Sequence, residues 1–201
     1  MAVNLGINDF LSNFKGGARP NLYAVVLSFP TGLGLNLVDK SQKLAYMCKA
    51  ASIPASTMGK AEVSFMGRKV KVAGDKDYDD WDITVVNDVS FDLRSVFEQW
   101  HEKINGNITN RANTLAVNPS NYYATADVYQ LNKDGNTLAH YKIEGMFPTS
   151  VAAIELGFET VDTIEEFAVT FSVNQWARIG ITNLSEVNSE LSALIANTKI
   201  F

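Results

Sequence analysis

Hydrophobic residues alternate with polar ones along much of the chain, with the period of two that is typical of β-strands. The clearest run is 167–173, where every second residue is Phe or Val, and 81–86 repeats the pattern. Residues 21–29 are almost continuously apolar, which predicts a strand buried on both faces. Residues 43–50 predict one more strand, ended by a proline. The pattern therefore predicts a mainly β protein.

Two hairpins are expected between such runs. Residues 60–72 read as a long extended hairpin with Met66-Gly67 at its tip. Residues 124–131 and 137–144 flank an Asp-Gly turn, which is a strong hairpin signal. In the arm 137–144 the polar residues, including His140, share one face.

One helix is predicted with a well-defined apolar stripe. Its apolar residues follow a 3.6-residue period: Leu93, Val96, Phe97, Trp100 and Ile104. Ser90 is the expected cap and Asn105-Gly106 the expected end. Residues 106–121 predict a polar loop, and 182–196 a weak helical stripe that needs a docking surface to persist.

Composition limits the class of protein. The 201 residues are 46% hydrophobic and 19% charged, with a net charge of −5. This suits one soluble domain and argues against a protein that grips nucleic acid. One cysteine excludes an intramolecular disulfide, and the sequence shows no signal peptide and no apolar run long enough to span a membrane.

Candidate chemistry is sparse. Cys48 is expected to be a small buried residue, and His101 and His140 to be solvated, because none has a visible nucleophile or carboxylate partner. The glycines at 32 and 34 lack the third glycine of a dinucleotide-binding loop. We therefore expect no enzyme and no cofactor.

An aspartate-rich turn resembles the start of a calcium-binding loop. Asp75, Asp77 and Asp79 have the right spacing, but Asp80 replaces the required glycine and Val86 the required glutamate. An acidic turn leading into a strand is the better interpretation, and no metal is expected.

Charge is distributed in blocks. Residues 40–76 carry eight basic and two acidic residues, 77–102 carry eight acidic residues and one Arg, and 144–166 carry six acidic residues and no basic one. Two interpretations stay open. The blocks are either ordinary solvated faces or two surfaces of opposite sign suited to head-to-tail self-association.

The hairpin at 60–72 combines apolar strands with basic residues after its tip. Such an element suits packing on another subunit, although it could also fold back on its own core. The candidate interface residues come from this hairpin and the acidic block after it: Val63, Phe65, Arg68, Lys69, Lys71, Asp79, Asp80 and Asp82.

Several short stretches match one known family in order. They are ARPNL at 18–22, CKA at 48–50, IPA at 53–55, FMGRKVKVAGD at 65–75, DDWDITVVND at 79–88, Phe97, Trp100 and GMFPT at 145–149. On these the chain resembles the tail tube proteins of contractile-tailed bacteriophages, over roughly residues 18–176.

The resemblance implies two packed antiparallel sheets with a flanking α-helix and a long hairpin. It implies hexameric rings in which strands from each subunit complete a continuous β-barrel. Such rings stack head to tail inside a contractile sheath and conduct double-stranded DNA into the host. The expected partners are further copies of the chain, the sheath protein, and baseplate and tail-terminator proteins. The expected location is the virion, after assembly in the host cytoplasm.

We expect one tail tube domain over 1–201, with a core at about 18–176, an N-terminal arm at 1–17 and a C-terminal extension at 177–201. The extension and residues 31–42 are longer than a minimal family member needs. They leave open a baseplate tube initiator or the inner tube of a phage-derived injection particle. The alternative from another class is a monomeric β-sandwich that binds a ligand. We also expect a neutral to acidic channel wall, because basic groups would retain DNA.

Overall fold

The computed structural model describes residues 6–14, 16–32 and 37–180. The strands are β1 (Tyr23–Ser28), β2 (Cys48–Ala51), β3 (Ser56–Phe65), β4 (Arg68–Tyr78), β5 (Trp81–Val86), β6 (Ala124–Leu131), β7 (Thr137–Val151), β8 (Glu166–Ser172) and β9 (Gln175–Ile179). The helices are α1 (Ile7–Phe14), α2 (Val38–Met47) and α3 (Asp92–Ile104), with short 3-10 helices η1 (Thr114–Val117) and η2 (Pro119–Asn121). The prediction of a mainly β chain is confirmed.

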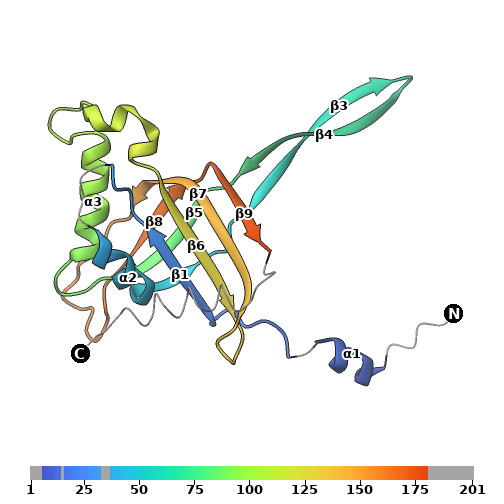
Figure 1. Cartoon of the computed structure of the whole chain (residues 1–201), viewed down its shortest axis with the longest axis horizontal. Helices are drawn as coiled ribbons and strands as arrows, with labels where there is room; N and C mark the ends of the chain where they lie inside the picture. The colour runs from blue at the N-terminus through green and yellow to red at the C-terminus, as the bar shows by residue number, and fades with distance from the viewer. Residues whose placement is uncertain (1–5, 15, 33–36, 181–201) are drawn as a thin grey trace.

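A bent antiparallel sheet forms the body of the molecule, with strand order β1-β6-β7-β8-β5-β2. The long strand β7 belongs to both halves of this sheet: its first part pairs with β6 and β9, and its last part pairs with β8. The halves fold over each other with α3 beside them, while the β3–β4 hairpin projects away from the body (Figure 1). The chain thus has the two expected antiparallel sheets, the flanking helix and the long hairpin.

Gly145 makes the corner between the two halves possible. Its φ of +65° lies in the left-handed region, and a Cβ there would lie 2.6 Å from the side-chain nitrogen Nδ2 of Asn174. Asn174 is in the short break between β8 and β9, which run one after the other along β7. Only glycine suits this position without strain, because it tolerates both the positive φ and the close approach.

The core lies between the sheet halves and α3. The predicted alternation in β5 and β8 is confirmed, since Trp81 and Phe171 are fully buried. The rings of Phe97 and Trp100 on α3 are also fully buried, and the ring centroids of Phe97 and Phe171 are 6.0 Å apart. Trp81 Nε1 donates to the Ser52 carbonyl over 2.8 Å, so the buried indole is hydrogen-bonded.

Two strand predictions need correction. Residues 43–47 belong to the helix α2, and only Cys48–Ala51 form a strand. A short apolar run fits either period, which is why the pattern failed here. In the run 21–29, the strand β1 buries Val25 and Leu27 on one face, whereas Ala24 and Val26 on the other face are only partly buried.

The cap predicted for α3 is also wrong. Phe91, with a φ of 54°, precedes the helix, and no side chain caps it. The Ser90 hydroxyl instead donates to Asp88 and accepts from Lys43 over 3.1 Å. The predicted end at Asn105 is confirmed.

Both predicted hairpins are confirmed. Met66 and Gly67 form the tip of β3–β4 with φ values of 47° and 76°, and the hairpin extends further toward the body than predicted. The helix α1 was not predicted. Residues 177–179, the first of the expected C-terminal extension, form the end of β9, while the stripe predicted at 182–196 lies outside the described residues. In the described part of the chain, no helix has the length and hydrophobicity needed to span a membrane.

Candidate assembly interface

The β3–β4 hairpin has one apolar face and one polar face. Its register places Val63 opposite Val70, and Phe65 opposite Arg68. With Val72, these side chains share one face because side chains in a strand alternate between faces. Phe65 is 64% exposed and Val63 57%, so this apolar face is uncovered in the subunit. The alternative that the hairpin folds back on its own core is therefore wrong for this chain.

The opposite face of the hairpin carries Lys69 and Lys71, whereas Arg68 shares the apolar face with Phe65. Glu62 lies between Lys69 and Lys71, with nitrogen–oxygen distances of 3.3 and 3.9 Å. Each of the three side chains is at least about one third exposed, so these ion pairs contribute little in water. The hairpin therefore presents an excess of positive charge beside its apolar face.

Trp176 on β9 fixes the base of the hairpin to the body. Its Nε1 donates to the Ala55 carbonyl over 2.9 Å, and its ring lies edge-on to Tyr78 at 6.3 Å. The Lys76 ammonium lies 5.3 Å from the Trp176 ring and 4.8 Å from the Tyr78 ring. These contacts set the direction in which the hairpin leaves the sheet.

Gly59 and Gly74 face each other where the hairpin register shifts by one residue. A Cβ on Gly74 would lie 3.0 Å from the backbone of Gly59, so the two strands approach closely there. Bulges of this kind increase strand twist. The part of the hairpin beyond them, Lys60–Ala73, contacts no other described element closely enough to be buried.

Side chains cover two of the edges of the body. His101 Nε2 lies 3.0 Å from the Pro148 carbonyl and Arg94 donates to the Ala152 carbonyl over 2.8 Å, so α3 covers the last part of β7. The carbonyl can only accept, which requires the proton on His101 Nε2. His101 is therefore half-buried and bonded, contrary to the prediction that it is solvated.

At the other end of the sheet, Tyr23 bridges β1 and β2. Its hydroxyl contacts the carbonyls of Cys48, at 3.0 Å, and of Lys49. The helix α2 packs against β1 beside it. Within the described residues, β9 pairs with β7 on one side and with no strand on the other. Open strand edges are thus present at β9 and at the adjoining hairpin.

The acidic candidates lie near the hairpin base. Asp79 and Asp80 are exposed in the link between β4 and β5, and Asp82 is on the outward face of β5. Asp82 already accepts a hydrogen bond from the Thr170 hydroxyl over 2.6 Å. The structure thus brings the eight candidates onto one hairpin and its base.

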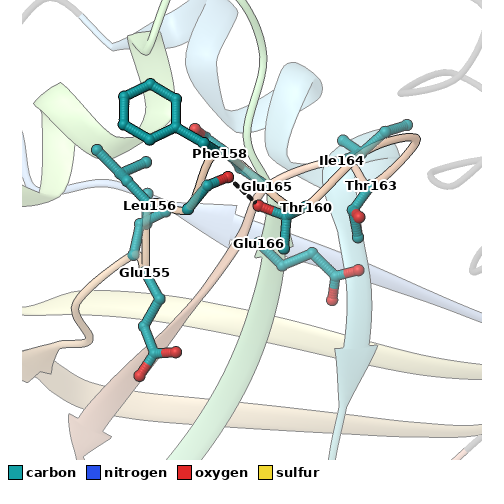
Figure 2. Close-up of a pocket in the computed structure, with 10 residues that line it drawn as sticks. Glu155, Leu156, Phe158, Thr160, Thr163, Ile164, Glu165 and Glu166 are labelled. Atoms are coloured by element: carbon teal, nitrogen blue, oxygen red, sulfur yellow. Dashed lines mark hydrogen bonds between the residues drawn. The ribbon is translucent and has the colours of Figure 1, made fainter.

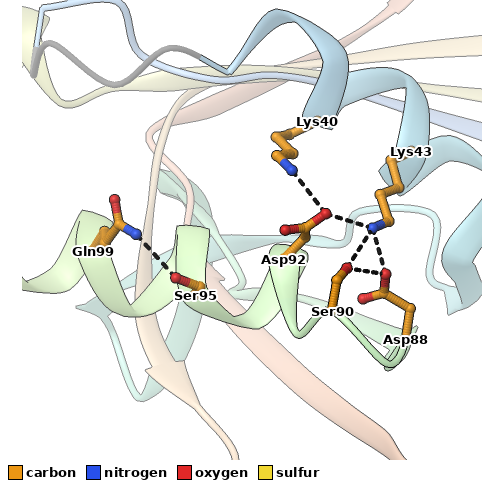
Figure 3. A network of polar contacts seen from close by, with 7 residues as sticks. All are labelled: Lys40, Lys43, Asp88, Ser90, Asp92, Ser95 and Gln99. Atoms are coloured by element: carbon orange, nitrogen blue, oxygen red, sulfur yellow. Dashed lines mark hydrogen bonds and ion pairs between the residues drawn. The ribbon is translucent and has the colours of Figure 1, made fainter.

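Part of the opposite charge is neutralised within the chain. Lys43 on α2 binds Asp88 and, at 2.7 Å, Asp92, and Lys40 lies 2.9 Å from Asp92 (Figure 3). Hydrogen bonds from Lys43 lower the pKa of both carboxyls and raise the pKa of the ammonium group. These charges hold α2 against α3 and are unavailable for stacking. The exposed hairpin charges are not consumed in this way.

The residues considered for chemistry are structural. Burial raises the pKa of the Cys48 thiol to about 11, so it is protonated at neutral pH. His140 was expected to be solvated, but it is buried, with Nε2 2.7 Å from Asp127 and its ring stacked on Tyr129. Counting the register from the Asp-Gly turn would have placed Asp127 and His140 near each other. In the part of the chain that the structure describes, no group of His, Cys, Asp or Glu is arranged to hold a metal.

Comparison with known sequences identifies the family. A family model described as phage tail tube protein matches residues 18–179. The chain belongs to this family. Tail tube protein gp19 of Enterobacteria phage T4 is 34% identical over 174 residues, which are 85% of this chain and 98% of that relative. The tail tube protein of Serratia phage KSP90 is 24% identical over 164 residues, 80% of this chain and 90% of that protein.

Solved structures share the fold at low identity. A chain of the anti-feeding prophage baseplate superposes with a TM-score of 0.59 and 11% identity, covering 83% of this chain and 97% of that one. A chain of the sheath-tube complex of an extracellular contractile injection system gives 0.54 and 12%, covering 85% and 97%. The tail tube protein described here is therefore a structural component of a phage virion.

Proposed function

We propose that this chain is the main tail tube subunit of a contractile-tailed phage, and that it assembles into hexameric rings stacked head to tail. The observation that carries the proposal is the apolar face of β3–β4, which stands uncovered and away from the body. An isolated two-stranded hairpin is marginal in water. A second copy would cover this face and complete the element.

The proposed interface consists of the hairpin and its base: Val63, Phe65, Arg68, Lys69, Lys71, Asp79, Asp80 and Asp82. The open edge of β9 supports a ring in which strands of neighbouring subunits continue one sheet. Closure of that sheet into a barrel would remove the remaining edges. Because β9 holds the hairpin base through Trp176, both features would act together.

The proposed surroundings are those of a tail: a contractile sheath outside, baseplate and terminator proteins at the ends, and passing double-stranded DNA within. The fold shared with chains of a sixfold-symmetrised baseplate and of a sheath-tube complex supports this arrangement. We further propose a role without catalysis or cofactor, and assembly in the host cytoplasm before incorporation into the virion.

The channel wall is proposed to be neutral to acidic. Next to the interface residue Asp82, the outward face of β5 and β8 offers such a surface, with Thr84 on β5 and Ala168 and Thr170 on β8. Each basic contact with DNA would add salt-dependent friction to its passage. A density map of the assembled tube with a ring of Lys or Arg in the channel would contradict this part.

Two alternative roles differ from the main tube in the particle, or the part of the tail, that the chain would build. A baseplate tube initiator, or the inner tube of an injection particle, would share the fold; the identity to phage tail tube proteins over most of the chain favours the main tube. Family membership argues against the monomeric binding module.

Size-exclusion chromatography with negative-stain microscopy of the purified full-length chain tests the proposal. We expect rings or tubes with sixfold end views as the concentration rises. A chain that stays a 22.1 kDa monomer at high concentration, both alone and with preformed tail baseplates, would contradict it.

A further inference from the structure

The connection between β7 and β8 exposes an unusual amount of apolar surface. We call residues 152–165 the β7–β8 loop. Four of its five large apolar side chains are 70% exposed or more: Leu156, Phe158, Val161 and Ile164. A group of this size on one loop marks an interaction surface, since scattered single residues would need no explanation.

The loop is anchored at both ends. Arg94 on α3 donates to the Ala152 carbonyl over 2.8 Å. Asn87 donates from its backbone to the Glu165 carbonyl over 2.8 Å and from its side chain to the Glu165 carboxylate over 3.1 Å. Within the loop, the Thr160 amide donates to the Gly157 carbonyl over 3.2 Å. The apolar side chains are therefore displayed on a defined backbone.

The loop surrounds a hollow of about 550 Å³. Figure 2 shows Leu156 and Phe158 on one side of it and Ile164 and Thr163 on the other. Hollows of this size accept large side chains. The residues around it are partly apolar and partly acidic, and none is basic.

The loop and the hairpin carry opposite charge. Residues 154–166 include five acidic residues and no basic one, whereas 60–72 include four basic residues and one acidic one. Glu166, the first residue of β8, binds Lys49, and Glu165 at the end of the loop binds Asn87. Glu155, Glu159 and Asp162 on the loop are exposed. The surfaces therefore match in apolar character and complement each other in charge.

The two surfaces lie at opposite ends of the molecule (Figure 1), so they cannot meet within one chain. Resting on the proposed tube function, we infer that the β3–β4 hairpin of one copy docks on the β7–β8 loop of another copy. Phe65 and Val63 cover Leu156 and Phe158 in this contact. An interface between two different surfaces repeats from copy to copy, which is the geometry a growing tube needs.

The basic side chains near the tip then face the exposed carboxylates of the loop. Arg68, which shares the docked face with Phe65, lies beside Glu155 of the other copy, and Lys69 extends from the opposite face toward Glu159 at the rim of the contact. This contact gives a role to an acidic segment that the internal ion pairs of the subunit leave largely unused.

Charge reversal tests the pairing. Arg68→Glu with Lys69→Glu, and separately Glu155→Lys with Glu159→Lys, should each raise the critical concentration for polymerisation roughly tenfold or more. All four changes together should restore most of the wild-type value. The matched control is Glu102→Lys with Asp134→Lys, which reverses two exposed carboxylates outside both surfaces and should leave polymerisation unchanged. Circular dichroism of each variant confirms that it folds.

Cysteine cross-linking gives an independent reading. Phe65→Cys with Phe158→Cys should form covalent chains of subunits on oxidation, because each subunit carries both halves of the contact. The native Cys48 is buried and does not compete. Phe65→Cys with Glu102→Cys should give no ladder.

The outcomes separate the two proposals. If the wild-type chain forms no rings or tubes, both the tube function and this contact fail. If tubes form, but the loop reversals leave them unchanged and no ladder appears, the contact is wrong while the tube function stands.

Discussion

The body of the subunit and its β3–β4 hairpin differ in whether their apolar strand faces are covered within the subunit. In the body, Trp81 and Phe171 are fully buried, and α3 and Tyr23 cover strand edges with hydrogen bonds. In the hairpin, Phe65 and Val63 are more than half exposed and only the paired strands support each other.

The difference lies in what surrounds each strand rather than in the strand sequences. Both regions alternate apolar and polar residues, so both are built to bury one face. The body finds its covering layer in the same chain, whereas no described segment covers the hairpin. A fold that closes most of its own edges and leaves one amphipathic element open is suited to controlled self-association.

The largest loss of stability is expected for a substitution in the core of the body. Phe97→Ala should lower the free energy of unfolding by about 3–5 kcal/mol, because it leaves a cavity among packed rings. Phe97 is fully buried and contacts Phe29, Phe167 and Phe171. Urea denaturation of the isolated subunit measures the loss. A loss below about 1 kcal/mol would mean that α3 does not pack as described.

The junction between the two regions should show an intermediate effect. Trp176→Phe keeps an aromatic ring but removes the hydrogen bond to Ala55, so we expect about 1 kcal/mol less stability. The hairpin base should also loosen, and trypsin should cleave more rapidly after Lys60 and Lys71. A cleavage rate equal to that of the wild type would show that Trp176 does not hold the hairpin.

The sequence anticipated the body and the hairpin, because both depend on local periodicity. The stripe on α3, the alternation in β8 and the tip at Met66 are all local signals, and all are confirmed. The failures involve context. Residues 43–47 belong to a helix with a buried Leu44, which a short apolar run alone does not distinguish from a strand. His140 is buried against Tyr129 from a neighbouring strand.

The interaction surfaces likewise include one that local periodicity predicts and one that it does not. Candidates such as Val63 and Phe65 could be found from the alternation along the hairpin. The exposed residues of the β7–β8 loop, such as Phe158, follow no period, so nothing distinguished them from core residues. Likewise, the internal pairing of Lys43 with Asp92 depends on how α2 and α3 pack, which the charge blocks do not reveal.

The hairpin face should matter little to the isolated subunit. Phe65→Ala with Val70→Ala should change the free energy of unfolding by less than about 0.5 kcal/mol, because exposed residues contribute little. The same variant should polymerise poorly. Denaturation and sedimentation of one preparation measure both, and a large loss of monomer stability would show that the hairpin packs on its own body.

The smallest effect concerns the ion pairs between α2 and α3. Lys43 lowers the pKa of Asp88 and Asp92, so their contribution to stability is present above the unfolded carboxyl pKa of about 4 and is lost as the pH falls through the lowered values. The stability difference between wild type and Lys43→Met should therefore stay constant from about pH 7 to about pH 5 and narrow as the pH falls below about 4. Denaturation midpoints across this range measure the difference. A gap that is constant with pH would contradict the assigned pairing.

Hydrogen exchange, compared between free subunits and assembled tubes, tests the central claim most directly. Amides of β3 and β4 should exchange rapidly in the free subunit and become strongly protected in the tube, while those of β5 and β8 are protected in both. A hairpin that is already protected in the free subunit, or that stays unprotected in the tube, would contradict the account.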